Sequence, residues 1–173
     1  MMMCSTQPSI ITHLVLNDIG IFVTAKSLTR LLEYVGKDPL LGSLDEAKDY
    51  FKRVFKTFGD LPEHVWQHFA QTSTYPVEQD GQGIKYRLKY DPRIASAVTA
   101  ADVNLESFFV KITSDILLLH GVESDILRQE DADKMATLNS KLELVNFPHI
   151  GHAPSLAVED QIAVVLEWIL ART

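Results

Sequence analysis

The chain has 173 residues, of which 46% are hydrophobic and 23% are charged. That length and composition suffice for a buried core and fit one domain, with room for a subdomain. The net charge of −7 and the pI of about 5.3 argue against nucleic acid or an anionic membrane as a partner, because both repel an acidic surface. A small neutral organic substrate fits this charge better.

Cys4 is the only cysteine, so an internal disulfide is excluded and a reducing compartment fits the chain. We interpret Cys4 as a buried helix residue rather than as a nucleophile. The apolar run over residues 10–23 is interrupted by Asn17 and Asp18, and no Lys or Arg precedes it. This pattern is typical of a buried strand and not of a signal peptide or a membrane span. We therefore expect a cytoplasmic protein.

Three segments have the pattern of parallel strands. The stretch from Ile11 to Leu16 is rich in β-branched and aliphatic residues, and polar residues and a glycine follow it. Ile116 to His120 is a continuous aliphatic run, and Leu142 to Phe147 interleaves apolar with polar positions, as an edge strand does. A helix is predicted over Asp131 to Asn139, between the second strand and the third.

The last helix is predicted from Val158 to Leu170. Its spacing favours an apolar face toward the sheet, with Trp168 on the flank of the helix. The residues expected on that face are Ile162, Val165, Leu166, Ile169 and Leu170.

Residues 22–112 have a largely helical pattern and interrupt the core, which is predicted to comprise residues 1–21 and 113–173. Ser43 to Glu46 form a capping box, so a helix should begin there. Another helix is expected to begin at Pro62, and residues 75–90 predict a hairpin or an extended excursion. His64 and His68 are spaced i, i+4, but without further ligand-type residues nearby we interpret them as surface residues and expect no metal.

Two side chains with catalytic chemistry follow strand ends. Asp125 lies just after the second strand and His152 just after the third, and in an open parallel sheet this is the edge where ligands bind. A carboxylate that orients an imidazole general base makes up two members of a nucleophile, base and acid triad. Asp18, after the first strand, is a second candidate for the acid, or a loop carboxylate that caps backbone N–H groups.

The segments around these residues resemble a known family. GVESDIL at 121–127 and IGHAPSL at 150–156 closely resemble the acid and histidine loops of α/β-hydrolases, and LVLNDIG at 14–20 resembles the strand after the nucleophile helix. YVGKDPL and KYDPRI resemble cap segments. The resemblance implies a partial α/β-hydrolase fold of about three parallel strands with flanking helices and a helical cap insertion. It also implies His152 as the base and favours Asp125 over Asp18 as the acid.

The hydrolase nucleophile stands in a G-x-S-x-G elbow, and this chain has no such motif. The chain therefore resembles the C-terminal part of a hydrolase, without the oxyanion-hole loop and the serine. Completed by an N-terminal part, it would hydrolyse an ester or a related small-molecule substrate without a cofactor. The alternatives are a catalytically inert fragment or interaction module and, more weakly, a lyase or dehalogenase on the same fold.

The strand from Ile11 to Leu16 is predicted to lack a neighbour on one side. An unpaired strand edge promotes association. We therefore expect a homodimer formed through this edge.

Overall fold

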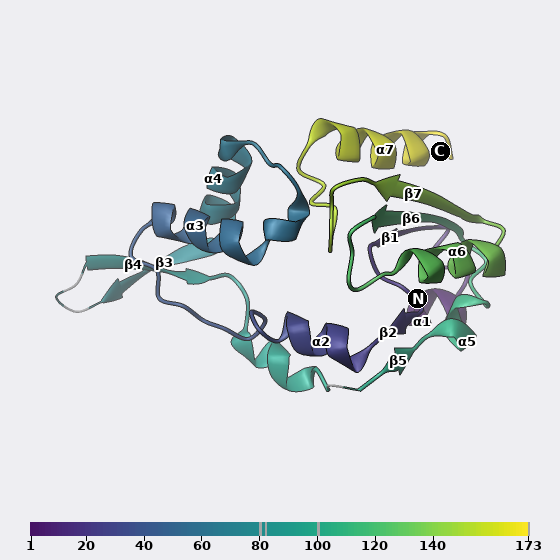
Figure 1. The fold of residues 1–173 in the computed structure, drawn as a ribbon, viewed down its shortest axis with the longest axis horizontal. Helices are drawn as coiled ribbons and strands as arrows, with labels where there is room; N and C mark the ends of the chain where they lie inside the picture. Colours follow the sequence, from purple (N-terminus) through teal and green to yellow (C-terminus); the bar gives the residue numbers. More distant parts are fainter. Residues whose placement is uncertain (80, 82, 100, 173) are drawn as a thin grey trace. The chain divides into compact units, whose positions relative to one another are not determined.

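The computed structural model describes residues 1–79, 81, 83–99 and 101–172, so Asp80 and Gln82 of the predicted hairpin lie outside the described residues. The chain forms two compact units (Figure 1). Unit 1 comprises residues 1–27, 57–59 and 101–173, and unit 2 comprises residues 28–56 and 60–100. Unit 2 is smaller than the predicted insertion at 22–112, because the residues at both ends of that range, and 57–59 within it, pack with unit 1.

Unit 1 is built on a parallel three-stranded sheet of order β1-β6-β7, formed by β1 (His13–Asn17), β6 (Asp115–Gly121) and β7 (Leu142–Phe147). The register pairs Leu16 with Leu118 and Leu118 with Leu144. From Ile116 to Gly121 every residue of the central strand β6 is buried. A strand that is covered on both faces reads as a continuous apolar run, which is why the sequence located β6 so clearly.

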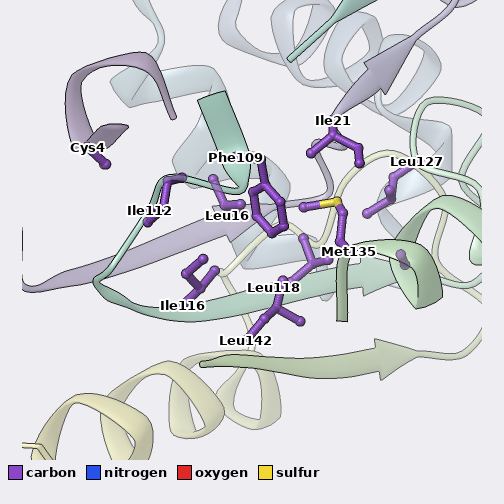
Figure 2. Close-up of a cluster of buried hydrophobic side chains, with 11 residues drawn as sticks. Cys4, Leu16, Ile21, Phe109, Ile112, Ile116, Leu118, Leu127, Met135 and Leu142 are labelled. Carbon is purple, nitrogen blue, oxygen red and sulfur yellow. The ribbon is translucent and has the colours of Figure 1, made fainter. Parts of the chain in front are cut away.

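Alternate residues of the sheet face two separate cores. One core covers the face that carries Leu16, Ile116 and Leu118, and Figure 2 shows Phe109 and Met135 meeting these side chains. They come from α5 (Glu106–Phe109) and α6 (Gln129–Leu138), the latter being the helix between β6 and β7. The N-terminal helix α1 (Met2–Thr6) adds Cys4, which is 2% exposed. The short strands β2 (Phe22–Val23) and β5 (Val103–Asn104) pair antiparallel beside this core.

The opposite face is covered by the last helix, α7 (Glu159–Leu170), which lies on the other side of the sheet from α6 (Figure 1). The predicted orientation of this helix is largely wrong. Trp168 is 5% exposed and packs with Val164 and Val165 against Leu117 and Leu119. Four of the five residues expected toward the sheet are instead 40–63% exposed: Ile162, Leu166, Ile169 and Leu170. Periodicity could not select the face, because apolar residues lie all round this helix.

Unit 2 packs its own core between α3 (Leu44–Val54), α4 (Glu63–Thr72) and the antiparallel hairpin of β3 (Thr74–Gln79) and β4 (Gly83–Leu88). The predicted helix start is confirmed, since Ser43 Oγ accepts the N–H of Glu46 at 3.1 Å. The Glu46 carboxylate accepts the N–H of Gly42 at 2.6 Å, one residue before the position that a capping box requires. Lys48 and Lys52 on α3 form ion pairs with Glu63 on α4 and lower the pKa of that carboxyl to about 2. The helix α2 (Ala25–Leu31) and the 3-10 turns η1 (Lys56–Phe58) and η2 (Pro92–Ala97) complete the described elements. Among the described residues, no helix combines the length and the apolar character needed to cross a bilayer.

At the outer edge of β1, some backbone N–H and C=O groups point away from β6. In the described part of the chain, β6 pairs with one side of β1 and no strand pairs with the other. Asp18 N–H donates to Leu119 O, and Thr12 O accepts from Asp115 N–H, so the even-numbered residues direct their backbone groups toward β6. The directions alternate along a strand, which turns the N–H of Val15 outward.

We predict that in the isolated chain, without a further segment beside β1, this edge pairs with the same strand of a second copy and gives a dimer. Val15→Pro removes an outward N–H without removing a bond to β6, so it should shift the chain toward the monomer, whereas Val15→Thr keeps the N–H and should not. Light scattering over a range of concentrations measures the shift. A wild-type chain that stays monomeric at the highest concentration would contradict the prediction.

Candidate active site

The carboxyl ends of the three parallel strands bring three loops of unit 1 together. Asp18 directly follows β1, residues 122–125 follow β6, and the loop after β7 leads to His152. Sheet topology thus gathers residues that are far apart in sequence at the edge where α/β proteins bind ligands.

The carboxylate of Asp18 is the best-connected group of this edge. Asp18 is 0% exposed. Its Oδ1 accepts the N–H of Gly121 at 2.9 Å, and its Oδ2 accepts both the hydroxyl of Ser124 at 2.5 Å and Nδ1 of His152 at 2.8 Å. Burying a carboxylate costs free energy unless hydrogen bonds compensate it, and these three donors supply that compensation.

The backbone of Asp18 helps to aim its carboxylate. Its φ is +52°, in the left-handed region that aspartate tolerates better than most residues. Its N–H still pairs with Leu119 O at 2.8 Å, so the chain leaves the sheet directly after this residue. The turn therefore places a charged side chain inside unit 1 rather than in solvent.

The imidazole of His152 has the arrangement of a general base. Its side chain is 22% exposed, and its Nδ1 faces the buried carboxylate oxygen of Asp18. An ionised carboxylate only accepts hydrogen bonds, so Nδ1 must carry the proton. Nε2 of the neutral ring then keeps its lone pair and can take a proton from a nucleophile, while Asp18 stabilises the imidazolium that forms.

The loop that carries His152 is held by two side chains that the sequence did not single out. Thr57 Oγ1 donates to the carbonyl of His152 at 2.8 Å, and the N–H of Gly151 donates to the carbonyl of Thr57 at the same distance. Asn17 Nδ2 donates to the carbonyl of Pro154 at 2.9 Å. No local pattern marks Thr57, because it lies 95 positions from His152 and outside any regular strand or α-helix.

Close approach of the two loops depends on Gly121. A Cβ added at this position would lie 2.3 Å from the carbonyl oxygen of Gly151 and 2.6 Å from that of Ile150. Both neighbours are backbone atoms and cannot move aside cheaply. The glycine therefore brings its N–H to Asp18 while the histidine loop passes directly over it.

The structure pairs His152 with Asp18, although the sequence favoured Asp125 as its partner. Asp125 is exposed, and its carbonyl accepts the hydroxyl of Ser27 at 2.9 Å. The preference for Asp125 rested on the resemblance of its loop to the acid loop of α/β-hydrolases. The structure shows that Ser124 is the residue of this loop that turns toward the pair. The contact with Nδ1 of His152 therefore makes Asp18 the acid candidate.

The other candidates are not among the residues that bond to Asp18 or His152. Cys4 is packed in the core of unit 1, and His64 and His68 are exposed on α4. Among the described residues, no group of three or more His, Cys, Asp or Glu side chains is placed to hold a metal ion.

Unit 2 contains an open cavity of about 560 Å³ with a mainly apolar lining. Its walls include Phe51, Phe55 and Leu88 together with Tyr50 and Tyr90. Burial raises the pKa of Tyr50 and of Tyr90, so both phenols stay neutral over the physiological range. A cavity of this size and lining suits a small apolar ligand.

A parallel sheet of order β1-β6-β7, with an acid and a histidine beyond its strand ends, places the chain in the α/β-hydrolase class of folds. The structure is similar to that of a presumed hydrolase from Rickettsia typhi, with a TM-score of 0.88, 32% identity and coverage of 99% of this chain and 58% of that one. It is also similar to an α/β hydrolase from Novosphingobium aromaticivorans, with a TM-score of 0.81, 28% identity and coverage of 99% and 60%.

The sequence is 26% identical over 166 residues to a 3-hydroxybutyrate-oligomer hydrolase of Cupriavidus necator, covering 91% of this chain and 56% of that protein. No family model matches the chain. The chain has the fold of the C-terminal part of an α/β hydrolase, as the sequence predicted. It spans less than two thirds of the length of each of these three relatives.

Substituting each of the two acid candidates by asparagine, one at a time, should distinguish them. In Asp18→Asn the amide no longer provides an anionic oxygen to Nδ1, so the downfield NMR signal of the His152 Nδ1 proton should disappear or move strongly upfield. Asp125→Asn is the matched control and should leave this signal in place. The opposite result, with the signal lost only in the Asp125 variant, would show that Asp125 is the partner in solution.

Proposed function

We propose that this chain supplies the base and the acid of an α/β-type ester hydrolase, with His152 as the base and Asp18 as the acid. The observation that carries the proposal is the 2.8 Å contact between His152 Nδ1 and a carboxylate oxygen that is excluded from solvent. The nucleophile is a serine from a part of the fold that this chain does not carry, since the chain has no G-x-S-x-G motif.

In the proposed reaction, Nε2 of His152 removes the proton of that serine as its oxygen attacks the ester carbonyl. The imidazolium formed is stabilised by Asp18 and returns the proton to the departing alcohol. Water, activated in the same way by His152, then cleaves the acyl-serine ester and releases the acid. Each half of the reaction leaves His152 neutral again, so the chain contributes a base that is restored in every turnover.

Two exposed surfaces of unit 1 support the proposal that a further segment completes the hydrolase fold. The outer edge of β1 is open among the described residues, and α7 exposes an apolar stripe formed by Ile162, Leu166 and Ile169. The three relatives are also longer than this chain. A segment that adds strands beside β1 would cover such an edge.

The substrate proposed is a small neutral or weakly anionic ester. The Cupriavidus relative is a hydrolase of 3-hydroxybutyrate oligomers. The net charge of −7 disfavours polyanionic substrates. Short hydroxyalkanoate esters are therefore the first compounds to test.

The second candidate is an inert association module, favoured by the absence of the serine elbow and by the open edge of β1. A base and an acid have nothing to activate without a nucleophile and an oxyanion hole. For either function, a fluorophosphonate probe should leave the mass of the isolated chain unchanged. An adduct that is lost in His152→Ala would instead locate an activated serine within these residues.

We predict that joining this chain to the part of the Cupriavidus relative that it does not match restores hydrolysis of p-nitrophenyl butyrate and of 3-hydroxybutyrate dimer. In this chimera, His152→Ala and Asp18→Asn should each lower kcat by about 10²-fold to 10⁴-fold, the usual contribution of a positioned base and its orienting acid. Asp125→Asn should stay within about threefold of the parent, because the side chain of Asp125 is exposed and Nδ1 of His152 bonds to Asp18 instead. Initial rates at saturating substrate give these ratios.

Two results would count against the proposal. Loss of activity in Asp125→Asn with activity retained in Asp18→Asn would reassign the acid. A chimera that folds, judged by its circular dichroism, but neither reacts with the probe nor hydrolyses either ester would favour the inert module.

A further inference from the structure

Ser124 occupies an unusual position between the acid and the backbone of its own loop. Its Oγ accepts the N–H groups of Ile126 and Leu127, both at 3.1 Å, and donates to Oδ2 of Asp18 at 2.5 Å. A hydroxyl has one hydrogen to donate and two acceptor sites. Both acceptor sites are filled, so the Ser124 proton is directed to Asp18.

The hydroxyl and the imidazole converge on the same oxygen. Oδ2 receives Ser124 and His152, whereas Oδ1 receives, among the described residues, the N–H of Gly121 alone. A carboxylate rotates about its Cβ–Cγ bond unless both of its oxygens are held. Gly121 and Ser124 hold one oxygen each, which leaves Oδ2 facing His152.

We propose that Ser124 is the positioning residue of the acid: it fixes the rotation of the Asp18 carboxylate so that Oδ2 stays on Nδ1 of His152. This role rests on the proposed function, in which the Asp18–His152 pair is the acid and the base. Ser124 acts through Asp18 and touches no reacting atom. Charge-assisted hydrogen bonds of this kind are short and stronger than neutral ones, which suits them to locking a side chain.

The loop of Ser124 has other attachments, so removing the hydroxyl should not release it. Ser27 Oγ donates to the carbonyl of Asp125 at 2.9 Å, and His120 Nε2 lies 3.0 Å from the carbonyl of Leu127. His120 is itself 0% exposed in β6, where its Nδ1 meets Asn146. These contacts hold the loop on the C-terminal side of the serine, and the N–H of Glu123 holds its N-terminal side by donating to the carbonyl of Ile150 at 2.9 Å.

The test is the exchange of the His152 Nδ1 proton with water in the isotope-labelled chain, measured by NMR. In Ser124→Ala this proton should exchange about tenfold faster or more, because the carboxylate loses a charge-assisted bond that held its rotation. Ser124→Thr keeps the hydroxyl and should stay within about twofold of the wild type. Ser27→Ala is the matched control: it loosens the same loop without touching the carboxylate, and should leave the exchange rate unchanged.

Three outcomes would overturn the inference. If the proton exchanges in Ser124→Ala at the wild-type rate, the serine only stabilises the turn of its own loop. The amide chemical shifts of Ile126 and Leu127 would still report the loss of that role. Equal acceleration in Ser27→Ala would assign the effect to the loop. If the Nδ1 proton of the wild-type chain is not protected from exchange, the Asp18–His152 hydrogen bond does not form in solution and the inference fails. The signal needs no nucleophile, so a chimera that fails to hydrolyse esters does not bear on this result.

Discussion

The buried carboxylate of Asp18 is the constraint that fixes how the loops at the carboxyl ends of β1, β6 and β7 are arranged. Its three donors come from the end of β6, from the loop after β6 and from the loop after β7. A charged group that is buried away from solvent requires such hydrogen-bond donors. Removing one donor leaves a desolvation penalty that no other contact compensates. The carboxylate therefore ties three separate stretches of sequence to one point.

The sheet determines where that point lies. Because β1 pairs with β6 in a fixed register that ends with Asn17 opposite Leu119, Asp18 leaves the sheet where its carboxylate can accept the N–H of Gly121. The cores on the two faces, one around Phe109 and one around Trp168, prevent β6 from slipping against its neighbours. A shift of one residue would move every apolar side chain to the wrong face and would take Asp18 away from its donors.

The local elements were predictable because local chemistry determines them. The run from Ile116 to His120 has the composition of a buried strand, and Ser43 with Glu46 marks a helix start that needs no tertiary information. The carboxylate that bonds to His152 was not predictable in the same way. Asp18 and Asp125 both follow strands, and only the three-dimensional turn at Asp18 shows which carboxylate enters the interior.

Two further misses have the same origin. The face of α7 could not be read from its sequence because every side of the helix carries apolar residues, and the small sheet buries only the side that bears Trp168. Thr57 bonds to the histidine loop from a segment that looks like part of the helical insertion. Contacts between distant segments decide both, and no spacing of residues encodes them.

The donors to Asp18 have a consequence for how catalysis would be assembled. All three belong to this chain, and so do Thr57 and Asn17, which hold the histidine loop. The geometry of the acid and the base therefore does not depend on the segment that carries the nucleophile. Such a segment has to bring only its serine and its oxyanion-hole N–H groups to Nε2 of an imidazole that is already oriented. In the division that we propose, the folding of unit 1 meets the cost of burying the carboxylate, and a segment that pairs along β1 would bring the nucleophile to a preorganised base.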